Sequence, residues 1–254
     1  MDNARPYENS ELKVLINKYS PYFFEIRKRI LFTLSIFATA TVVGFVYYEK
    51  IIKFVIDILS LKGVNIVFTS PFQFINLAIS CGITTGLILV FPLIAYQILS
   101  FLKPALKYKE YRIAIKSLLF SIVLFLIGFL FGIFIMKWQI QLFLTKSVEL
   151  GIGNILDISR LISTVLMISS LMGLAFQAPI IMLLLLRIGI IKHTQLSKKR
   201  LWVYLGSLFF TILLPLDSIL ADIFLALPLI VLFELTLLLN RIFEKRKIEV
   251  TSSS

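Results

Sequence analysis

The residues of this sequence that could do chemistry are a few polar side chains set in apolar or oppositely charged surroundings. Gln177 lies ten residues before Arg187 in an otherwise apolar stretch, so a helix would carry its amide about 15 Å into a membrane. An unpaired amide is costly in hydrocarbon, and Gln177 should therefore face a neighbouring helix, a groove or water. An interhelical hydrogen bond beside a kink at Pro179 is the simplest interpretation, and a groove that meets a ligand is the alternative.

Glu25 and Glu110 stand out for a different reason, because each is an isolated acid among many basic residues. A local salt bridge is the simplest interpretation, with Arg29 for Glu25 and with Arg112 for Glu110, at about 0.2–0.5 kcal/mol each. The functional alternative is that both carboxylates receive a cationic ligand from the cytoplasmic or stromal side.

A second group of polar residues lies near the C-terminus. Asp217 follows Pro215 in a short turn, where its simplest role is to cap the next helix. Glu234 lies further along that helix, where we expect it either to reach the membrane surface or to pair with Arg241.

The chain has few residues and no motifs that would suggest catalysis. Cys81 is the only cysteine and His193 the only histidine, which excludes an internal disulfide and leaves no second imidazole for a zinc site. The sequence has no phosphate loop, no HExxH and no GxSxG motif. We therefore expect neither enzymatic activity nor a cofactor, a metal or a nucleic-acid partner.

The composition indicates that lipid is the solvent of most of the chain. Hydrophobic residues make up 59% of the 254, charged residues only 16%, and the mean hydropathy is +0.95. Soluble domains carry about 45–50% apolar and about 25% charged residues. The fold class predicted is therefore an all-α integral membrane protein in one membrane domain.

Six apolar runs mark the predicted membrane spans, and they are 30–48, 74–102, 117–136, 161–186, 201–216 and 219–240. The first has 19 residues, or about 28 Å as a helix, which matches a hydrocarbon core of about 30 Å. The fifth has 16 residues and reaches only about 24 Å, so the bilayer should thin there or the helix should sit deep. Only Asp217 and Ser218 separate it from the sixth, which predicts an antiparallel hairpin.

Basic residues set the orientation. With six spans, 20 of the 26 Lys and Arg residues fall on the side of both chain ends. That asymmetry predicts that the N-terminus and the C-terminus both lie inside, on the cytoplasmic or stromal face. The predicted organisation is an inner segment at 1–29, a transmembrane domain at 30–240 and an inner tail at 241–254.

The two long outer connections are predicted to hold interfacial helices. In residues 49–59, Ile52, Val55, Ile56 and Leu59 share one helical face, which suits a helix lying flat on the outer leaflet. Residues 138–150 show a weaker version of the same pattern.

Six segments, in order, resemble the motifs of TatC, the twin-arginine translocase subunit family. They are PYFFEIRKRI at 21–30, SPFQF at 70–74, the stretch from Pro92 through KPAL at 103–106 to Glu110 and Arg112, FQAP at 176–179, PLD at 215–217, and PLIVLFE at 228–234. The resemblance covers nearly the whole chain, from Pro21 to Arg241. No single motif is specific for the family. Six motifs in this order, on a predicted six-helix plan, are specific for it.

The resemblance implies a concave, six-helix receptor and scaffold that moves folded proteins across a membrane with the proton motive force. It implies that Glu25 and Glu110, with Arg27 beside them, bind the arginine pair of twin-arginine signal peptides. Carboxylates suit that role because they can bind guanidinium groups in a bidentate way.

The resemblance also implies partners. They are single-span subunits of the TatA/TatB type and further copies of the chain in a homo-oligomer. Gln177 and Pro179 would lie in a groove that meets the partner helix, and Pro215, Asp217 and Glu234 would complete the partner region.

The sequence departs from the family pattern at five positions. The family residues His, Glu, Trp, Glu and Pro are replaced, in chain order, by Tyr22, Gln73, Leu99, Gln177 and Leu216. The most consequential change is at Gln177, since glutamine can still form hydrogen bonds but cannot titrate.

Two further questions are open at the level of sequence. A small-solute secondary transporter is the alternative function, although no matched pair of Gly- or Pro-broken helices suggests inverted repeats. A bias toward Phe, Ile and Lys is typical of AT-rich genomes and favours a plastid (thylakoid) membrane, with the bacterial inner membrane as the alternative.

Overall fold

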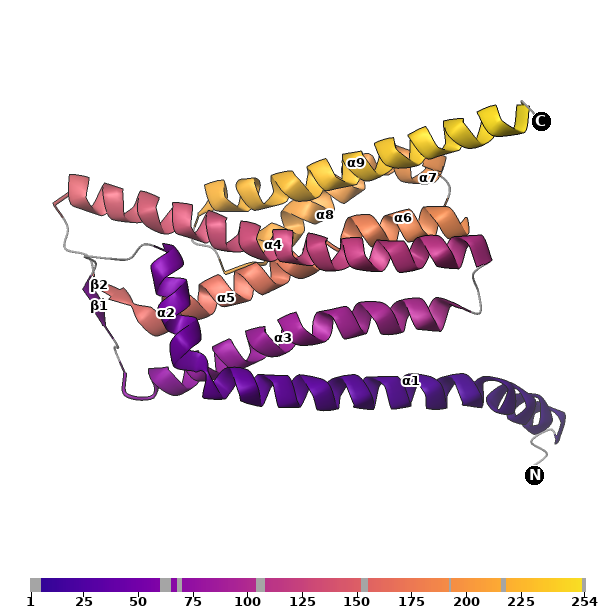
Figure 1. Cartoon of the computed structure of the whole chain (residues 1–254), viewed down its shortest axis with the longest axis horizontal. Coiled ribbons are helices and arrows are strands. Elements are labelled where there is room, and N and C mark those ends of the chain that lie inside the picture. Colours follow the sequence, from indigo (N-terminus) through magenta and orange to yellow (C-terminus); the bar gives the residue numbers. More distant parts are fainter. Residues whose placement is uncertain are drawn as a thin grey trace, which may run out of the picture.

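The computed structural model describes residues 6–59, 65–67, 70–103, 108–151, 155–191, 193–215 and 218–252. Its elements are α1 (Pro6–Val46), α2 (Tyr48–Leu59), β1 (Asn65–Val67), α3 (Gln73–Leu102), α4 (Tyr108–Glu149), β2 (Ile155–Asp157), α5 (Ile158–Ala175), α6 (Ala178–Ile188), α7 (His193–Lys198), α8 (Arg200–Ile212) and α9 (Ile219–Ser252). The long helices run along one common axis (Figure 1).

The membrane-spanning character of the chain is confirmed by helix length and apolarity. Within the described residues, five stretches are long and apolar enough to cross a membrane: Phe24–Val46, Gln73–Phe101, Ser117–Glu149, Ile158–Leu186 and Ile219–Arg241. The remaining candidate, α8, has 13 residues and reaches only about 20 Å, because it ends at Ile212 rather than at the predicted 216. The number of six membrane spans therefore stays a prediction, and α8 would be the shortest of the six.

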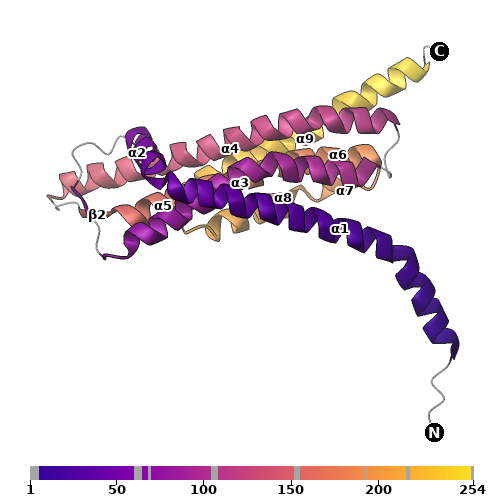
Figure 2. The same ribbon diagram turned by 60° about the horizontal axis from the view of Figure 1, so that its bottom comes forward.

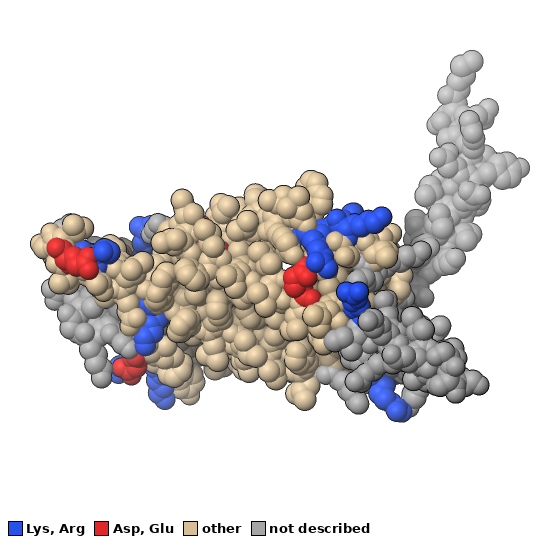
Figure 3. Space-filling model, turned by 90° about the horizontal axis from the view of Figure 1, so that it is seen from above, with Lys and Arg blue, Asp and Glu red and all other residues tan. Residues whose placement is uncertain are grey.

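The start of α1 and the end of α9 lie at the same end of the bundle (Figures 1 and 2). We call it the inner end, after the orientation predicted from the basic residues, and the opposite end the outer end. Figures 1 and 2 show the N-terminal part of α1 and the C-terminal part of α9 at that end, which agrees with an even number of crossings. Charged side chains gather toward the two ends of the molecule, with a broad, mostly uncharged band between them (Figure 3). The predicted segment boundaries at 29/30 and 240/241 fall inside the continuous helices α1 and α9.

The two predicted interfacial helices have different outcomes. Helix α2 runs across the end of the bundle (Figure 1) and buries Val55 and Leu59, as the apolar face of 49–59 predicts. The prediction of a separate helix at 138–150 is wrong, because α4 continues without a break to Glu149. A surface helix and a continued span share one periodicity, so the pattern could not distinguish them.

A small parallel sheet joins the two outer connections, which the all-α prediction did not include. Strand β1 pairs with β2 in the register Asn65 with Ile155 and Val67 with Asp157. Next to it, the Gln73 Nε2 donates to Asp157 Oδ2 at 2.7 Å, and the Ser159 hydroxyl donates to the Gln73 carbonyl at 3.0 Å. The Gln73 amide can donate to Asp157, whereas a carboxylate at this position would repel it.

Two glycine-lined seams hold the bundle together. Gly82 and Gly86 lie four residues apart on α3 against α1, and Gly128 and Gly132 lie four apart on α4 against α5. A Cβ on Gly132 would lie 2.6 Å from the Cα of Ser169, so the two backbones approach more closely than any side chain permits. Small residues four apart are the usual means of close helix packing in membranes.

The predicted break near Pro179 is confirmed. Helix α5 ends at Ala175 and α6 begins at Ala178, with Pro179 in its first turn. Proline is tolerated there because its missing N–H would have no partner inside the helix. The break places Gln177 between the two helices.

Candidate functional site

The inner end of α1 carries the first candidate site. The Glu25 side chain is 50% exposed, and its Oε1 accepts a hydrogen bond from Arg29 Nη2 at 2.5 Å. Arg29 also donates through Nη1 to the Gln97 carbonyl on α3 at 2.8 Å. The predicted i, i+4 salt bridge is therefore present, and Arg29 is held from a second helix at the same time.

The other residues predicted for this site flank it. Arg27 is exposed on α1. Glu110 lies in the first turn of α4, which starts at the bundle end where α1 carries Glu25 (Figure 1). The side chain of Glu110 is outside the described residues. The fold thus brings the helix positions of both acids to one end of the molecule.

Gln177 is buried, with 8% of its surface exposed. Its Oε1 accepts a hydrogen bond from the Ser121 hydroxyl on α4 at 2.5 Å, and its Nε2 donates to the carbonyls of Ser121 at 3.2 Å and Gly173 at 3.3 Å. The cavity beside it has a volume of only about 90 Å³. The interhelical hydrogen bond expected from the sequence is therefore present, and the amide faces α4 and not a wide groove.

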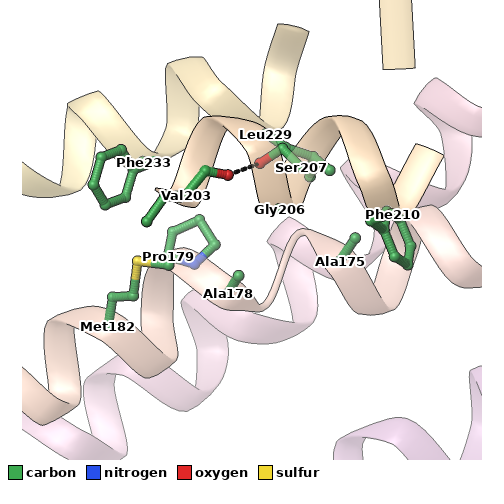
Figure 4. A pocket seen from close by; sticks show the side chains of 10 residues that line it. All are labelled: Ala175, Ala178, Pro179, Met182, Val203, Gly206, Ser207, Phe210, Leu229 and Phe233. Atoms are coloured by element: carbon green, nitrogen blue, oxygen red, sulfur yellow. Dashed lines mark hydrogen bonds between the residues drawn. The ribbon is translucent and has the colours of Figure 1, made fainter. Parts of the chain in front are cut away.

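A larger apolar depression lies on the other side of the α5–α6 break, and we call it the α6–α8 groove. It has a volume of about 390 Å³ and is lined by Ala175, Ala178, Pro179, Met182, Val203, Gly206, Ser207, Phe210, Leu229 and Phe233 (Figure 4). Within this lining, the Ser207 hydroxyl donates to the Val203 carbonyl of its own helix at 2.9 Å. The surface it offers is consequently almost entirely apolar.

Glu234 lies beside this groove, next to the lining residue Phe233. Its Oε1 accepts a hydrogen bond from the Tyr204 hydroxyl, and its Oε2 lies 3.4 Å from Arg200 Nη1. Both partners come from α8, whereas the sequence suggested Arg241 on the same helix as Glu234. The carboxylate thus links α8 to α9 while 38% of its side chain remains exposed.

The five residues predicted for the partner region do not line one cavity. Pro179 lines the α6–α8 groove, Glu234 adjoins it, Gln177 faces α4, and Pro215 lines a crevice at the outer end. Asp217 is outside the described residues. No group of three or more His, Cys, Asp or Glu side chains that could hold a metal occurs in the described part of the chain.

Some residues of these sites were missed from the sequence. Ser121, Gln97 and Tyr204 each complete a polar contact with a residue at least 30 positions away. A serine, glutamine or tyrosine inside an apolar run was the available signal, but it does not name the partner. The glycine pairs four residues apart on α3 and α4 are the sequence signal for the two seams.

Comparison with known proteins decides the family. The family profile described as "Sec-independent protein translocase protein (TatC)" matches residues 22–228. This chain belongs to the TatC family. TatC proteins are components of a translocase and not enzymes, and they are multi-pass membrane proteins.

Similar TatC proteins come from several bacteria. TatC of Listeria innocua is 30% identical over 224 residues, covering 85% of this chain and 88% of its own. TatCy of Bacillus subtilis is 29% identical over 85% of this chain and 86% of its own, and Aquifex aeolicus TatC is 28% identical over 89% and 95%.

Solved structures give the same answer. A crystal structure of the twin-arginine translocase receptor TatC in the detergent DDM superposes with a TM-score of 0.77 at 26% identity, covering 85% of this chain and 98% of that one. A second TatC crystal structure gives 0.73 at 26% identity, covering 87% and 98%.

Proposed function

We propose that this TatC chain is the receptor that binds the arginine pair of a twin-arginine signal peptide at its inner end. The observation that carries the proposal is the environment of Glu25. This half-exposed carboxylate already holds one guanidinium, that of Arg29, at 2.5 Å. A carboxylate has about four lone-pair sites, so Glu25 retains capacity for a second guanidinium. Glu110 supplies a second acid at the same end of the bundle.

The test is crosslinking of a photoreactive signal peptide to the chain in detergent or nanodiscs. A twin-arginine peptide should crosslink at the inner ends of α1 and α4, and a matched twin-lysine peptide should crosslink much less. The reason is that a lysine ammonium cannot form the planar, paired hydrogen bonds of a guanidinium. Equal crosslinking of both peptides would contradict recognition of arginine by carboxylates.

The second part of the proposal concerns the partner of the α6–α8 groove. The apolar lining, the Pro179 break and the short α8 together suit the transmembrane helix of a single-span TatA/TatB-type subunit. Glu234, with Tyr204 and Arg200, would meet the polar end of that helix. Pro215 and Asp217 would hold the outer turn, and Gln177 would fix the α5–α6 break against α4.

Gly206 offers a clean test of this groove. A Cβ at Gly206 would meet no atom within 4 Å, so Gly206→Leu should fill the groove without disturbing the fold. We expect co-purification of the single-span partner to fall about tenfold or more, because the leucine takes the space of a partner side chain. The thermal stability of the chain alone should stay unchanged, and full recovery of the partner would place its helix elsewhere.

Other parts of the expected function rest on the family or on composition and are proposals. They are assembly as a homo-oligomer, transport driven by the proton motive force, and the identity of the membrane. The residue bias favours a plastid (thylakoid) membrane, whereas the relatives named above are bacterial and favour an inner membrane. The comparisons give no support to the solute-transporter alternative.

A further inference from the structure

A crevice of about 710 Å³ opens at the outer end of the bundle, opposite the proposed signal-peptide site. Helix α4 forms one wall from Met136 to Lys146, and α5 and the end of β2 form another. Pro215 and Ser218, which flank the α8–α9 turn, close it. We call this space the outer crevice, and its volume is that of a small-molecule site.

The lining of the outer crevice is amphiphilic. Met136, Ile140 and Phe143 supply an apolar wall on α4, and Lys146 and Arg160 supply two exposed cations. Arg160 directly precedes the apolar residues of α5, so its guanidinium lies near the hydrocarbon boundary and the crevice extends into the headgroup layer. Apolar walls below and cations above match a phospholipid with its headgroup at the rim.

Both cations are available to a ligand. No ion pair or hydrogen bond of the Arg160 guanidinium occurs within the described residues. Lys146 lies 2.7 Å from Glu149, but both side chains are more than half exposed, and such pairs contribute little net energy. The acid at the rim, Asp157, already accepts hydrogen bonds from Gln73 at 2.7 Å and from the backbone N–H of Arg160 at 3.1 Å.

We propose that the outer crevice binds an anionic phospholipid of the outer leaflet. The phosphate lies between Lys146 and Arg160, and an acyl chain follows Met136 and Ile140 toward the hydrocarbon. A single-span partner helix is the poorer fit because its apolar surface would leave Lys146 and Arg160 without a counter-charge, whereas the α6–α8 groove proposed for that helix is almost entirely apolar.

The test compares two pairs of outer-end cations in the purified full-length chain. Phosphatidylglycerol binding is measured by native mass spectrometry for Lys146→Gln/Arg160→Gln and for the control Lys50→Gln/Lys53→Gln, whose lysines are exposed on α2. We expect about 30-fold weaker binding in the first pair only, since each basic residue contributes about fivefold near an anionic lipid surface. An equal loss in both pairs would show unspecific charge attraction and overturn the proposal.

Two further measurements distinguish the possible ligands and keep the proposal testable if the double variant does not fold. Phosphatidylcholine should bind the wild-type chain weakly, and inorganic phosphate should not displace phosphatidylglycerol. If inorganic phosphate displaced phosphatidylglycerol at a concentration similar to that of the lipid, the crevice would be a site for the anion alone and not for a phospholipid. In the wild-type chain, phosphatidylglycerol with a photoreactive acyl chain should label residues 136–143 of α4. Labelling only at other helices would overturn the assignment even if the double variant does not fold.

Discussion

Glu25→Gln is expected to weaken binding of a twin-arginine signal peptide by about 30-fold. A hydrogen bond to a charged group contributes about 2 kcal/mol, and the substitution removes the charge while keeping the shape of the side chain. The Arg29 side chain keeps its hydrogen bond to the Gln97 carbonyl on α3, so the inner end of α1 should stay in place. Fluorescence anisotropy of a labelled signal peptide, titrated with the chain in nanodiscs, measures the change.

The control for this prediction is Glu149→Gln at the opposite end of the bundle. Glu149 is 56% exposed and paired with Lys146 at 2.7 Å, which closely matches the exposure and pairing of Glu25. Its replacement should leave peptide binding unchanged. Glu110→Gln should resemble Glu25→Gln, and unchanged affinity in both inner variants would refute the assigned site.

The second large effect is expected from Gly132→Leu in the seam between α4 and α5. The new Cβ would lie 2.6 Å from the Cα of Ser169, and backbone cannot move aside as the end of a side chain can. The two helices must separate, which should reduce the free energy of unfolding by about 3 kcal/mol. The seam also holds Gln177 against Ser121, so the α5–α6 break should loosen with it. Thermal unfolding in detergent, followed by intrinsic fluorescence, measures the loss.

Gly206→Leu is the matched control for this prediction. It makes the same chemical change in a helix, gains the same helix propensity, and places its Cβ in open space. The midpoint of unfolding should fall strongly for Gly132→Leu and stay near the wild type for Gly206→Leu. Similar midpoints for the two variants would show that the seam is not closely packed in the membrane protein.

Much of the fold could be predicted from the sequence because hydrocarbon leaves few choices. A backbone in lipid must satisfy its own hydrogen bonds, so each long apolar run is expected to be helical. Each predicted span is largely helical, although 161–186 is interrupted between α5 and α6 and the helix of 201–216 ends at Ile212. Helix ends were less predictable. The uncharged run that ends at Met136 does not mark the end of α4, since packing against its neighbours carries that helix to Glu149.

The candidate sites were predictable in position but not in partner. Hydropathy and charge alone single out the isolated acids at 25 and 110 and the amide at 177. A polar side chain inside an apolar run, or an acid among basic residues, is easily recognised in a sequence. The sequence could not decide whether Gln177 faces a groove or a helix. Rotating a helix by one residue moves a side chain by about 100°, and only neighbouring helices select the angle.

Family membership and the arrangement of apolar spans were therefore determined by the sequence itself. The tertiary structure alone decided the contacts between distant residues: Arg29 with Gln97 over 68 positions, Ser121 with Gln177 over 56, and Gln73 with Asp157 over 84. The contact between Ser121 and Gln177 depends on how closely α4 and α5 approach at Gly128 and Gly132 and on where α5 gives way to α6. The contact between Arg29 and Gln97 depends on how α1 packs against α3 at Gly82 and Gly86. Hydropathy determines that a segment lies in lipid, whereas steric fit between helices determines which of its faces meets which neighbour.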